Sequence, residues 1–83
     1  MYVILSRDKL APGIHVMRIA APAVARKAQA GQFVIIRVDE RGERIPLTIA
    51  DWDRDEGSVT IVFMEAGKTT RQLATLEAGD SLA

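Results

Sequence analysis

The sequence contains no cysteine and only one histidine, and these two absences exclude several kinds of chemistry. Without cysteine the chain forms no disulfide, offers no thiolate nucleophile and holds no Cys-ligated zinc or iron–sulfur cluster. A single histidine leaves no His-based metal site or catalytic triad. We therefore expect no catalytic residue and no metal ligand set in this chain, so any redox chemistry requires a bound cofactor.

An excess of charge of either sign is also missing. Eleven Lys and Arg residues balance eleven Asp and Glu residues, which makes the formal net charge zero. No summed positive field would attract nucleic acid or an anionic membrane. A small barrel that binds nucleic acid is therefore the weakest of our interpretations, because a stripe of aromatic and basic residues is also lacking.

Long hydrophobic runs are absent as well. Charged residues interrupt the apolar stretches after a few positions, so none is long enough for a membrane span or a signal peptide. The sequence thus predicts a soluble, globular, cytoplasmic protein with no membrane partner. Its 83 residues allow one domain, and a chain this small is marginally stable unless a ligand or partner contributes.

What the sequence does contain is a series of short β-prone runs separated by Gly, Pro and Asp. This spacing is typical of an all-β barrel or sandwich. The first two runs should pair as a hairpin around the turn at 11–13, and the second should place His15, Met17 and Ile19 on one face. The expected strands are 2–6, 14–20, 33–38, 44–50 and 58–64, with a further strand beginning at 80–83.

Two segments favour short helices. The alanine-rich range 22–30 can form a helical turn, which Gly31 would end. After Gly67 the hydrophobic period changes, and Thr69 or Thr70 can cap a short helix. This second helix would carry Leu73 and Leu76 on one face and end at Ala78–Gly79.

The segment R-I-P-L-T-I-A, residues 44–50, is unusual for a strand. Pro46 cannot donate a hydrogen bond to a ladder, so the segment is either an edge strand or an interrupted one. Arg44 is able to hold a phosphate through two hydrogen bonds. The simpler interpretation is a surface arginine on an edge strand that the proline protects from aggregation.

A second unusual segment is Gly67-Lys68-Thr69-Thr70. It is similar to the end of a nucleotide-binding P-loop, but the first glycine of that motif would fall at position 62, which is Val62. What remains is a glycine that permits close backbone approach, followed by hydroxyl residues at a helix start, a combination that suits a phosphate. An ordinary capped helix is the alternative.

Taken together and in this order, the two segments resemble the FAD-binding β-barrel of the ferredoxin–NADP reductase superfamily. That barrel carries an R-x-[YF]-[ST] motif on a strand and a G-x-x-[ST] motif before a short helix, and R-I-P-L-T is similar to a variant of the first. The stretches P-G-I-H-V-M, A-G-Q-F-V-I-I-R-V, R-I-P-L-T-I-A-D-W-D and V-F-M-E-A-G-K-T-T-R-Q-L extend the resemblance over the chain. They are similar to electron-transfer subunits of dihydroorotate dehydrogenase and, still more, to the small subunit of NADH-dependent reduced ferredoxin:NADP oxidoreductase.

The resemblance implies a six-stranded antiparallel Greek-key barrel with one short helix and a truncated last strand. It also implies an FAD-binding module that passes electrons between NAD(P)H and iron–sulfur or ferredoxin centres, with a larger flavin and iron–sulfur subunit as partner. Such relatives continue into a nicotinamide-binding domain and an iron–sulfur segment. We therefore interpret residues 1–83 as a C-terminally incomplete FAD-binding domain that is not catalytically competent alone.

The resemblance also assigns cofactor-binding roles to individual residues. Arg44 would contact the FAD pyrophosphate, and Thr48 would hydrogen-bond the flavin near N5. The Phe63 ring would stack on part of the dinucleotide. Leu47 departs from the family pattern, because it occupies the position of an aromatic residue that stacks on the flavin. The isoalloxazine would be lined by Pro46, Leu47 and Thr48, and the adjoining wall would consist of Val62, Phe63 and Met64. The phosphates would be bound by Gly67, Lys68, Thr69 and Thr70. Leu73 would anchor the helix to the barrel.

Several alternatives stay open. The chain could bind no flavin and instead self-associate as a homodimer, with a second copy completing its incomplete edge strand. His15 is more simply a histidine satisfied within the protein than a ligand. The acidic range 51–55 lacks the spacing of a calcium loop and is better explained as a solvated turn, and Trp52 is better explained by packing.

Overall fold

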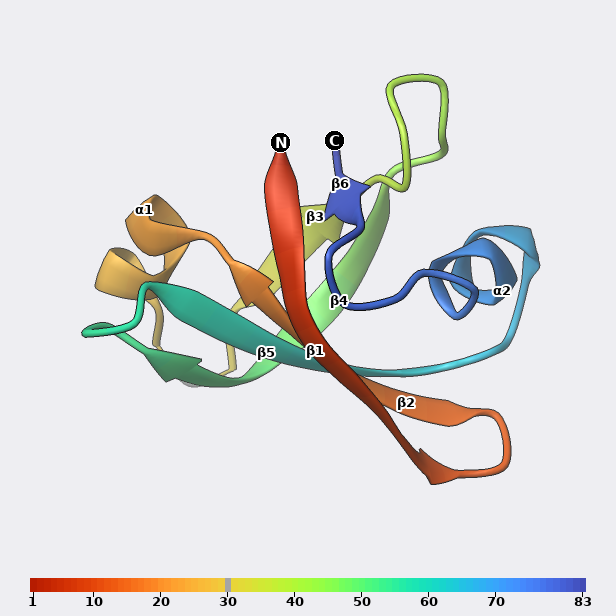
Figure 1. Cartoon of the computed structure of the whole chain (residues 1–83), viewed down its shortest axis with the longest axis horizontal. Coiled ribbons are helices and arrows are strands. Elements are labelled where there is room, and N and C mark those ends of the chain that lie inside the picture. Colours follow the sequence, from red (N-terminus) through yellow and green to blue (C-terminus); the bar gives the residue numbers. More distant parts are fainter. Residues whose placement is uncertain (30) are drawn as a thin grey trace.

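Residues 1–29 and 31–83 are described by a computed structural model, in which antiparallel strands make up most of the chain (Figure 1). Two short helices interrupt the strands, and the predicted all-β class is confirmed. The second and the fifth of the predicted strands, 14–20 and 58–64, are present with the expected bounds. The elements are β1 (Tyr2–Ala11), β2 (Ile14–Ala20), α1 (Pro22–Lys27), β3 (Phe33–Ile36), β4 (Ile45–Asp53), β5 (Ser58–Met64), α2 (Lys68–Leu73) and β6 (Ser81–Leu82).

The strands form one curled sheet with the order β3-β4-β5-β2-β1-β6. Each described pairing is antiparallel, and the predicted β1–β2 hairpin is present. The two edges of the sheet approach each other, because the backbone N of Ala83 donates to the carbonyl of Arg37 at 3.2 Å. Figure 1 accordingly shows β6 beside β3, which makes the sheet a partly closed barrel.

The core lies inside this curl and follows the alternation of side chains along the strands. On β2, His15, Met17 and Ile19 are buried while the residues between them are partly exposed, as predicted. The neighbouring strand β5 continues this wall of the core, because Val59 and Ile61 pair with Ile19 and Met17 on the same face. The buried hydrophobic residues are Ile4, Met17, Ile19, Ala21, Ala25, Ala28, Ile36, Ile49, Val59, Ile61, Phe63, Leu73 and Leu82.

Three strand ends differ from the prediction by two residues or more. Strand β1 reaches Ala11 because it pairs with β2 along nearly its whole length; Asp8 and Lys9 are exposed, and Arg7 is partly buried. Strand β4 continues to Asp53, since residues 51–53 pair with the start of β5. Strand β3 ends at Ile36, two residues early, where its pairing with Ile45 ends.

The helices also differ in detail. Helix α1 occupies the first part of the predicted range 22–30 and begins with Pro22 in its first turn, a position that proline favours. Ala30, the last residue of that range, lies outside the described residues. None of the helices in the described ranges is long and apolar enough to cross a bilayer.

Helix α2 corrects two expectations. Its N-cap is Gly67 rather than Thr69 or Thr70, and Thr70 contributes from the third helical position. The Thr70 hydroxyl accepts the backbone N–H groups of Ala66 at 2.9 Å and Gly67 at 3.0 Å. The helix ends at Leu73 instead of Ala78–Gly79, because the carbonyls of Ala74 and Leu76 accept hydrogen bonds from the Arg7 guanidinium.

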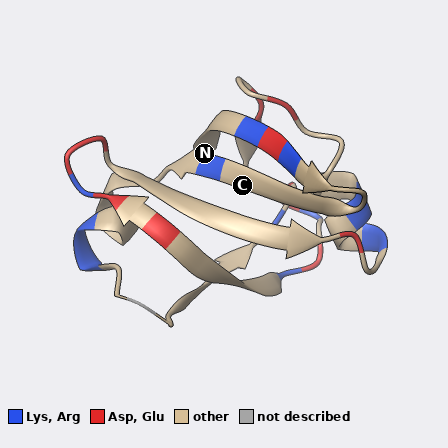
Figure 2. Cartoon of the chain, turned by 90° about the horizontal axis from the view of Figure 1, so that it is seen from below, with Lys and Arg blue, Asp and Glu red and all other residues tan. Residues whose placement is uncertain are grey.

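Charged residues are spread over the loops, the helices and the strand ends rather than gathered on one face (Figure 2). The distribution agrees with the zero net charge of the sequence. Two ion pairs are formed by the described residues, His15 with Glu65 and Arg18 with Glu56.

Candidate functional site

The strand register brings the two unusual segments of the sequence to the same end of the sheet. Ile49 of β4 pairs with Ile61 of β5 in antiparallel orientation. Residues before Ile49 and residues after Ile61 therefore run in the same direction, toward α2 (Figure 1). Segment 44–48 and segment 62–70 thus lie at the same end of the sheet although they are separate in sequence.

The two strands stop pairing at this end. Among the described residues, Ile45–Thr48 pair only with β3, and Val62–Met64 pair only with β2. The β4–β5 ladder is already irregular between Ile49 and Asp51, where β4 carries one extra residue. Strands β4 and β5 therefore diverge, and one edge of β4 is left without a neighbouring strand at the candidate site.

Pro46 fits this divergence. It lies opposite Ile35 of β3, and the backbone N of Ile49 donates to the Gln32 carbonyl at 2.9 Å. Hydrogen-bonded and non-hydrogen-bonded positions alternate along an antiparallel ladder, so the N atom of Pro46 is directed away from β3. The proline costs no bond to β3, and β4 is an interrupted inner strand rather than an edge strand.

The expected wall on β5 divides between the two faces of the sheet. Val62 and Met64 are exposed on the outer face, with Met64 61% exposed. Phe63 points inward, is 4% exposed and stacks on His15 with ring centroids 5.3 Å apart. Stacking of the Phe63 ring on a dinucleotide therefore does not fit its position, and only its backbone is available to a ligand on the outer face.

The motif residues on β4 alternate in the same way. Pro46 and Thr48 are exposed, whereas Leu47 is partly buried and packs against the core. Arg44 is exposed immediately before β4 begins. Pro46, Thr48, Val62 and Met64 thus provide a mainly apolar outer surface, with Arg44 at its border.

Sequence reasoning missed two residues of this outer surface. Phe33 and Ile35 lie directly opposite Thr48 and Pro46 across the β3–β4 ladder, and they are 62% and 53% exposed. Directly opposed residues of a ladder share one face. All four residues of β3 are apolar, so its sequence carries no alternation that could have distinguished its two faces.

The turn before α2 leaves room at its backbone. Gly67 is extended, with φ −167°, and a Cβ atom added there would meet nothing within 4 Å. The packing of this chain therefore does not require glycine at position 67. Lys68 is exposed and Thr69 is buried beneath it. Within residues 1–29 and 31–83, neither Lys68 nor Arg44 has a side-chain hydrogen bond or ion pair.

A polar cluster around the buried side chain of His15 adjoins this turn. His15 hydrogen-bonds Glu65 through Nε2 at 3.1 Å and contacts the Arg7 guanidinium through Nδ1. The hydrogen bond from His15 lowers the pKa of the Glu65 carboxyl; desolvation opposes this shift, and the charges of Lys9 and Arg71 add to it. The interpretation of His15 as satisfied within the protein is confirmed.

The acidic turn and its tryptophan have structural roles. The Asp53 carboxylate accepts the backbone N–H groups of Asp55 at 3.0 Å and Glu56 at 2.9 Å, as in an ordinary turn. Trp52 packs against the core, and the Arg54 guanidinium lies 5.7 Å from its ring centroid. The packing role of Trp52 is confirmed, whereas the turn is formed only by residues 54–57, because residues 51–53 continue β4.

Comparisons with known proteins place this geometry in context. No protein-family model matches the chain. It is 42% identical over 79 residues, 95% of its length, to the homolog of the electron transfer subunit of dihydroorotate dehydrogenase B (NAD(+)) from Thermotoga maritima. The corresponding subunit of Streptococcus mutans is 36% identical over 81 residues, again 95% of the chain. A chain in the structure of NADH-dependent reduced ferredoxin-NADP oxidoreductase matches 99% of it with 40% identity and a TM-score of 0.95.

These matches extend over nearly the whole chain and agree in fold and sequence with the FAD domain of ferredoxin reductases. The resemblance stated from the motifs is thereby confirmed. The chain spans 28% of the Thermotoga relative, 31% of the Streptococcus relative and 30% of the solved chain. An uncharacterized protein from the adh 3' region of Clostridium beijerinckii matches the full length of this chain at 55% identity, again over 28% of the relative.

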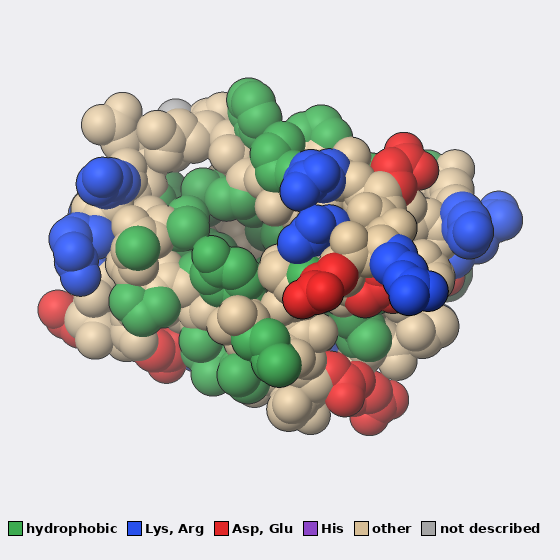
Figure 3. All heavy atoms as spheres, turned by 90° about the horizontal axis from the view of Figure 1, so that it is seen from above, with side chains coloured by type: hydrophobic (Ala, Val, Ile, Leu, Met, Phe, Trp, Pro, Cys, Tyr) green, Lys and Arg blue, Asp and Glu red, His purple; other side chains and the backbone are tan. Residues whose placement is uncertain are grey.

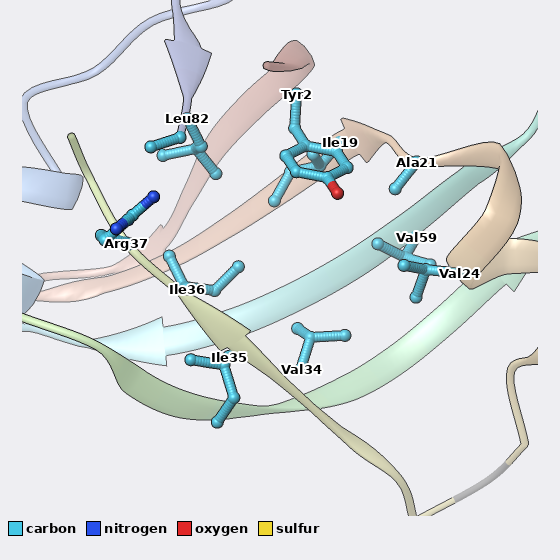
Figure 4. Close-up of a pocket in the computed structure, with 11 residues that line it drawn as sticks. Tyr2, Ile19, Ala21, Val24, Val34, Ile35, Ile36, Arg37, Val59 and Leu82 are labelled. Atoms are coloured by element: carbon cyan, nitrogen blue, oxygen red, sulfur yellow. The ribbon is translucent and has the colours of Figure 1, made fainter. Parts of the chain in front are cut away.

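A separate hollow lies away from the motif residues. It is about 170 Å³ in volume and opens between β3 and the strands β1 and β6. Figure 3 shows a hollow among hydrophobic side chains on the face that carries both termini, and Figure 4 shows Tyr2, Ile36 and Leu82 around it. None of the expected cofactor-binding residues lines this hollow, which is smaller than the roughly 300 Å³ of a typical ligand site.

Proposed function

We propose that this chain is the FAD-binding module of an electron-transfer flavoprotein that passes electrons between NAD(P)H and iron–sulfur or ferredoxin centres. The observation that carries the proposal is the strand register, which places segments 44–48 and 62–70 at the same end of the sheet, where the β4–β5 ladder ends. The relatives support it, because they are electron-transfer subunits of dihydroorotate dehydrogenase B and a structure studied for flavin-based electron bifurcation. In the complete protein, we propose a larger flavin and iron–sulfur subunit as partner.

The residues present fit an FAD molecule. Arg44 and Lys68 are exposed cations without a described partner, and both are available to the pyrophosphate. Gly67 leaves open space where a phosphate would approach the backbone. Thr69 and Thr70 complete this turn, with the Thr70 hydroxyl holding its backbone in place.

The ring system would lie against the outer surface. Pro46, Val62 and Met64 offer apolar contact, and Thr48 offers a hydroxyl for a hydrogen bond near N5. Leu47 and Phe63 would contribute backbone atoms, since their side chains face the core. The flavin supplies the electron chemistry when bound, while these residues bind and orient it.

Flavin retention tests the proposal directly. The purified chain is incubated with excess FAD, passed through a desalting column and examined by visible absorbance. We expect a retained flavin spectrum, and we expect FMN, which lacks the second phosphate and the adenosine, to be retained less. Absence of retained FAD, together with no saturable quenching of FAD fluorescence in a titration, would contradict flavin binding by this chain.

Self-association through an edge strand is a second candidate function, favoured by the surface of β3. Phe33 and Ile35 are large, apolar and exposed on an edge strand, and such edges pair readily with another chain. The opposite edge strand, β6, is only two residues long. Size-exclusion chromatography with light scattering tests this candidate: a dimer that Ile35→Lys converts to a monomer supports it, and a monomer at all concentrations contradicts it.

A further inference from the structure

Three side chains form a polar network between the sheet and α2, and His15 is its buried member. His15 of β2 is 5% exposed and lies between Arg7 of β1 and Glu65, the residue that follows β5. Arg7 also donates to the carbonyls of Ala74 and Leu76. Nothing in the proposed flavin contacts uses this network, although buried polar groups are costly unless they are fully paired.

The chemistry of the partners assigns the proton on His15. A guanidinium group donates hydrogen bonds and accepts none, so the Nδ1 atom of His15 facing Arg7 is the acceptor. The ring proton is therefore on Nε2, which donates to Glu65 Oε2 at 3.1 Å. The lowered pKa of Glu65 agrees with a carboxylate that accepts this bond.

The network holds both ends of the α2 segment. On one side Glu65 is followed directly by Ala66 and Gly67, the turn that opens α2. The backbone N of Glu65 also donates to the Gly13 carbonyl at 2.8 Å. On the other side Arg7 binds the carbonyls at which the helix ends. Because α2 has only six residues, it has few internal bonds with which to fix its own position.

We propose that His15 is a positioning residue for flavin binding: through its Nε2–H bond to Glu65 it holds the Ala66–Gly67 turn in the geometry that receives the FAD phosphates. This inference rests on the proposed function. Its decisive contact is the one with Glu65, since Glu65 adjoins the turn, whereas the contact with Arg7 anchors the far end of the helix.

Two substitutions of His15 separate these contacts. The amide N–H of glutamine in His15→Gln can reach Glu65 as Nε2 does, whereas the amide oxygen of asparagine in His15→Asn can accept from Arg7 as Nδ1 does. Both lose the stacking on Phe63, so both should lose stability similarly. Glu65→Ala breaks the link without altering a buried side chain. Glu77→Ala is its control, because Glu77 is an exposed glutamate that lines, together with Arg7 and His15, a second hollow separate from the one between β3 and β1.

We measure the FAD dissociation constant by fluorescence titration of the full chain. His15→Asn and Glu65→Ala should raise it about tenfold, the size expected for losing a hydrogen bond to a charged group. His15→Gln and Glu77→Ala should change it less than about threefold. Equal dissociation constants for His15→Asn and His15→Gln would overturn the proposal, because a purely structural role predicts equal loss.

A second measurement does not depend on FAD. In amide NMR spectra of the flavin-free chain, the Gly67 and Lys68 resonances should move in His15→Asn and Glu65→Ala and stay near their original positions in His15→Gln and Glu77→Ala. If wild type binds no FAD but these shifts occur, the proposed function fails while the positioning of the turn stands. Unmoved Gly67 and Lys68 resonances in both His15→Asn and Glu65→Ala would overturn the positioning role itself.

Discussion

The two sides of β5 are built for different purposes. Toward β2 it pairs at all seven positions, and the inward residues of this ladder form the centre of the core. Toward β4 it pairs only from Ser58 to Ile61, after which the strands separate. The same strand thus serves as a rigid scaffold on one side and as the border of an open, cationic, partly apolar surface on the other. The proposed flavin site therefore lies where regular pairing stops, and the core lies where it continues.

The largest effect should follow from a change on the scaffold side. Ile61 is fully buried against Met17, so Ile61→Ala should lower the free energy of unfolding by about 2–5 kcal/mol. Its neighbour Val62 faces outward, and Val62→Ala should cost less than about 1 kcal/mol. Urea denaturation followed by circular dichroism measures both. Similar losses of unfolding free energy for the two variants would contradict the distinction between the inward, buried face of β5 and its outward, exposed face.

On the open side, Arg44→Ala should act on binding and leave stability unchanged. Loss of a charge-assisted contact to the pyrophosphate should weaken FAD binding by about 1.5–3 kcal/mol. Arg41→Ala is the matched control, since Arg41 is an exposed arginine of the same loop. Isothermal titration gives both affinities, and an unchanged affinity for Arg44→Ala would remove Arg44 from the site.

Thr70 lies at the boundary of the two regions, so its substitution should affect both properties slightly. Thr70→Val removes the acceptor for the Ala66 and Gly67 N–H groups and should cost about 1 kcal/mol in stability and in FAD affinity. Thr75→Val is the control, because the Thr75 hydroxyl only donates to the Gln72 carbonyl at 2.7 Å. A loss of stability with unchanged affinity would show that the Thr70 hydroxyl has a structural role only.

The smallest effect should come from the ionisation of Glu65. Its pKa is lowered in the folded chain by the hydrogen bond from His15, so its contribution to stability is present above the unfolded pKa and lost as pH falls through the folded pKa. Wild type should therefore be more stable than Glu65→Gln near neutral pH, and the difference should shrink below about pH 4.5. Thermal melts across pH 3–7 measure it, and a difference that is constant over this range would contradict the assignment.

Much of the fold could be read from local sequence. Strands β2 and β5 were predicted with their observed bounds, because their β-branched residues and flanking glycines act over short distances. The end of α2 could not be predicted, since it depends on Arg7, which is distant in sequence. The same limit applies to the site: the motifs identified Arg44 and Gly67, but the inward orientation of Phe63 and the exposure of Phe33 follow from strand register.

By itself, the sequence determined the all-β class, the alternation of the core strands and the two motifs that connect the chain to its family. Composition, secondary-structure propensity and motif spacing are local properties, so they can be evaluated without knowledge of tertiary contacts. Only the tertiary structure decided that β4 and β5 diverge beyond Ile49 and Ile61 and that His15 is held between Arg7 and Glu65. These features require residues from different strands to meet, and the pairing of strands is settled by the packing of the whole core.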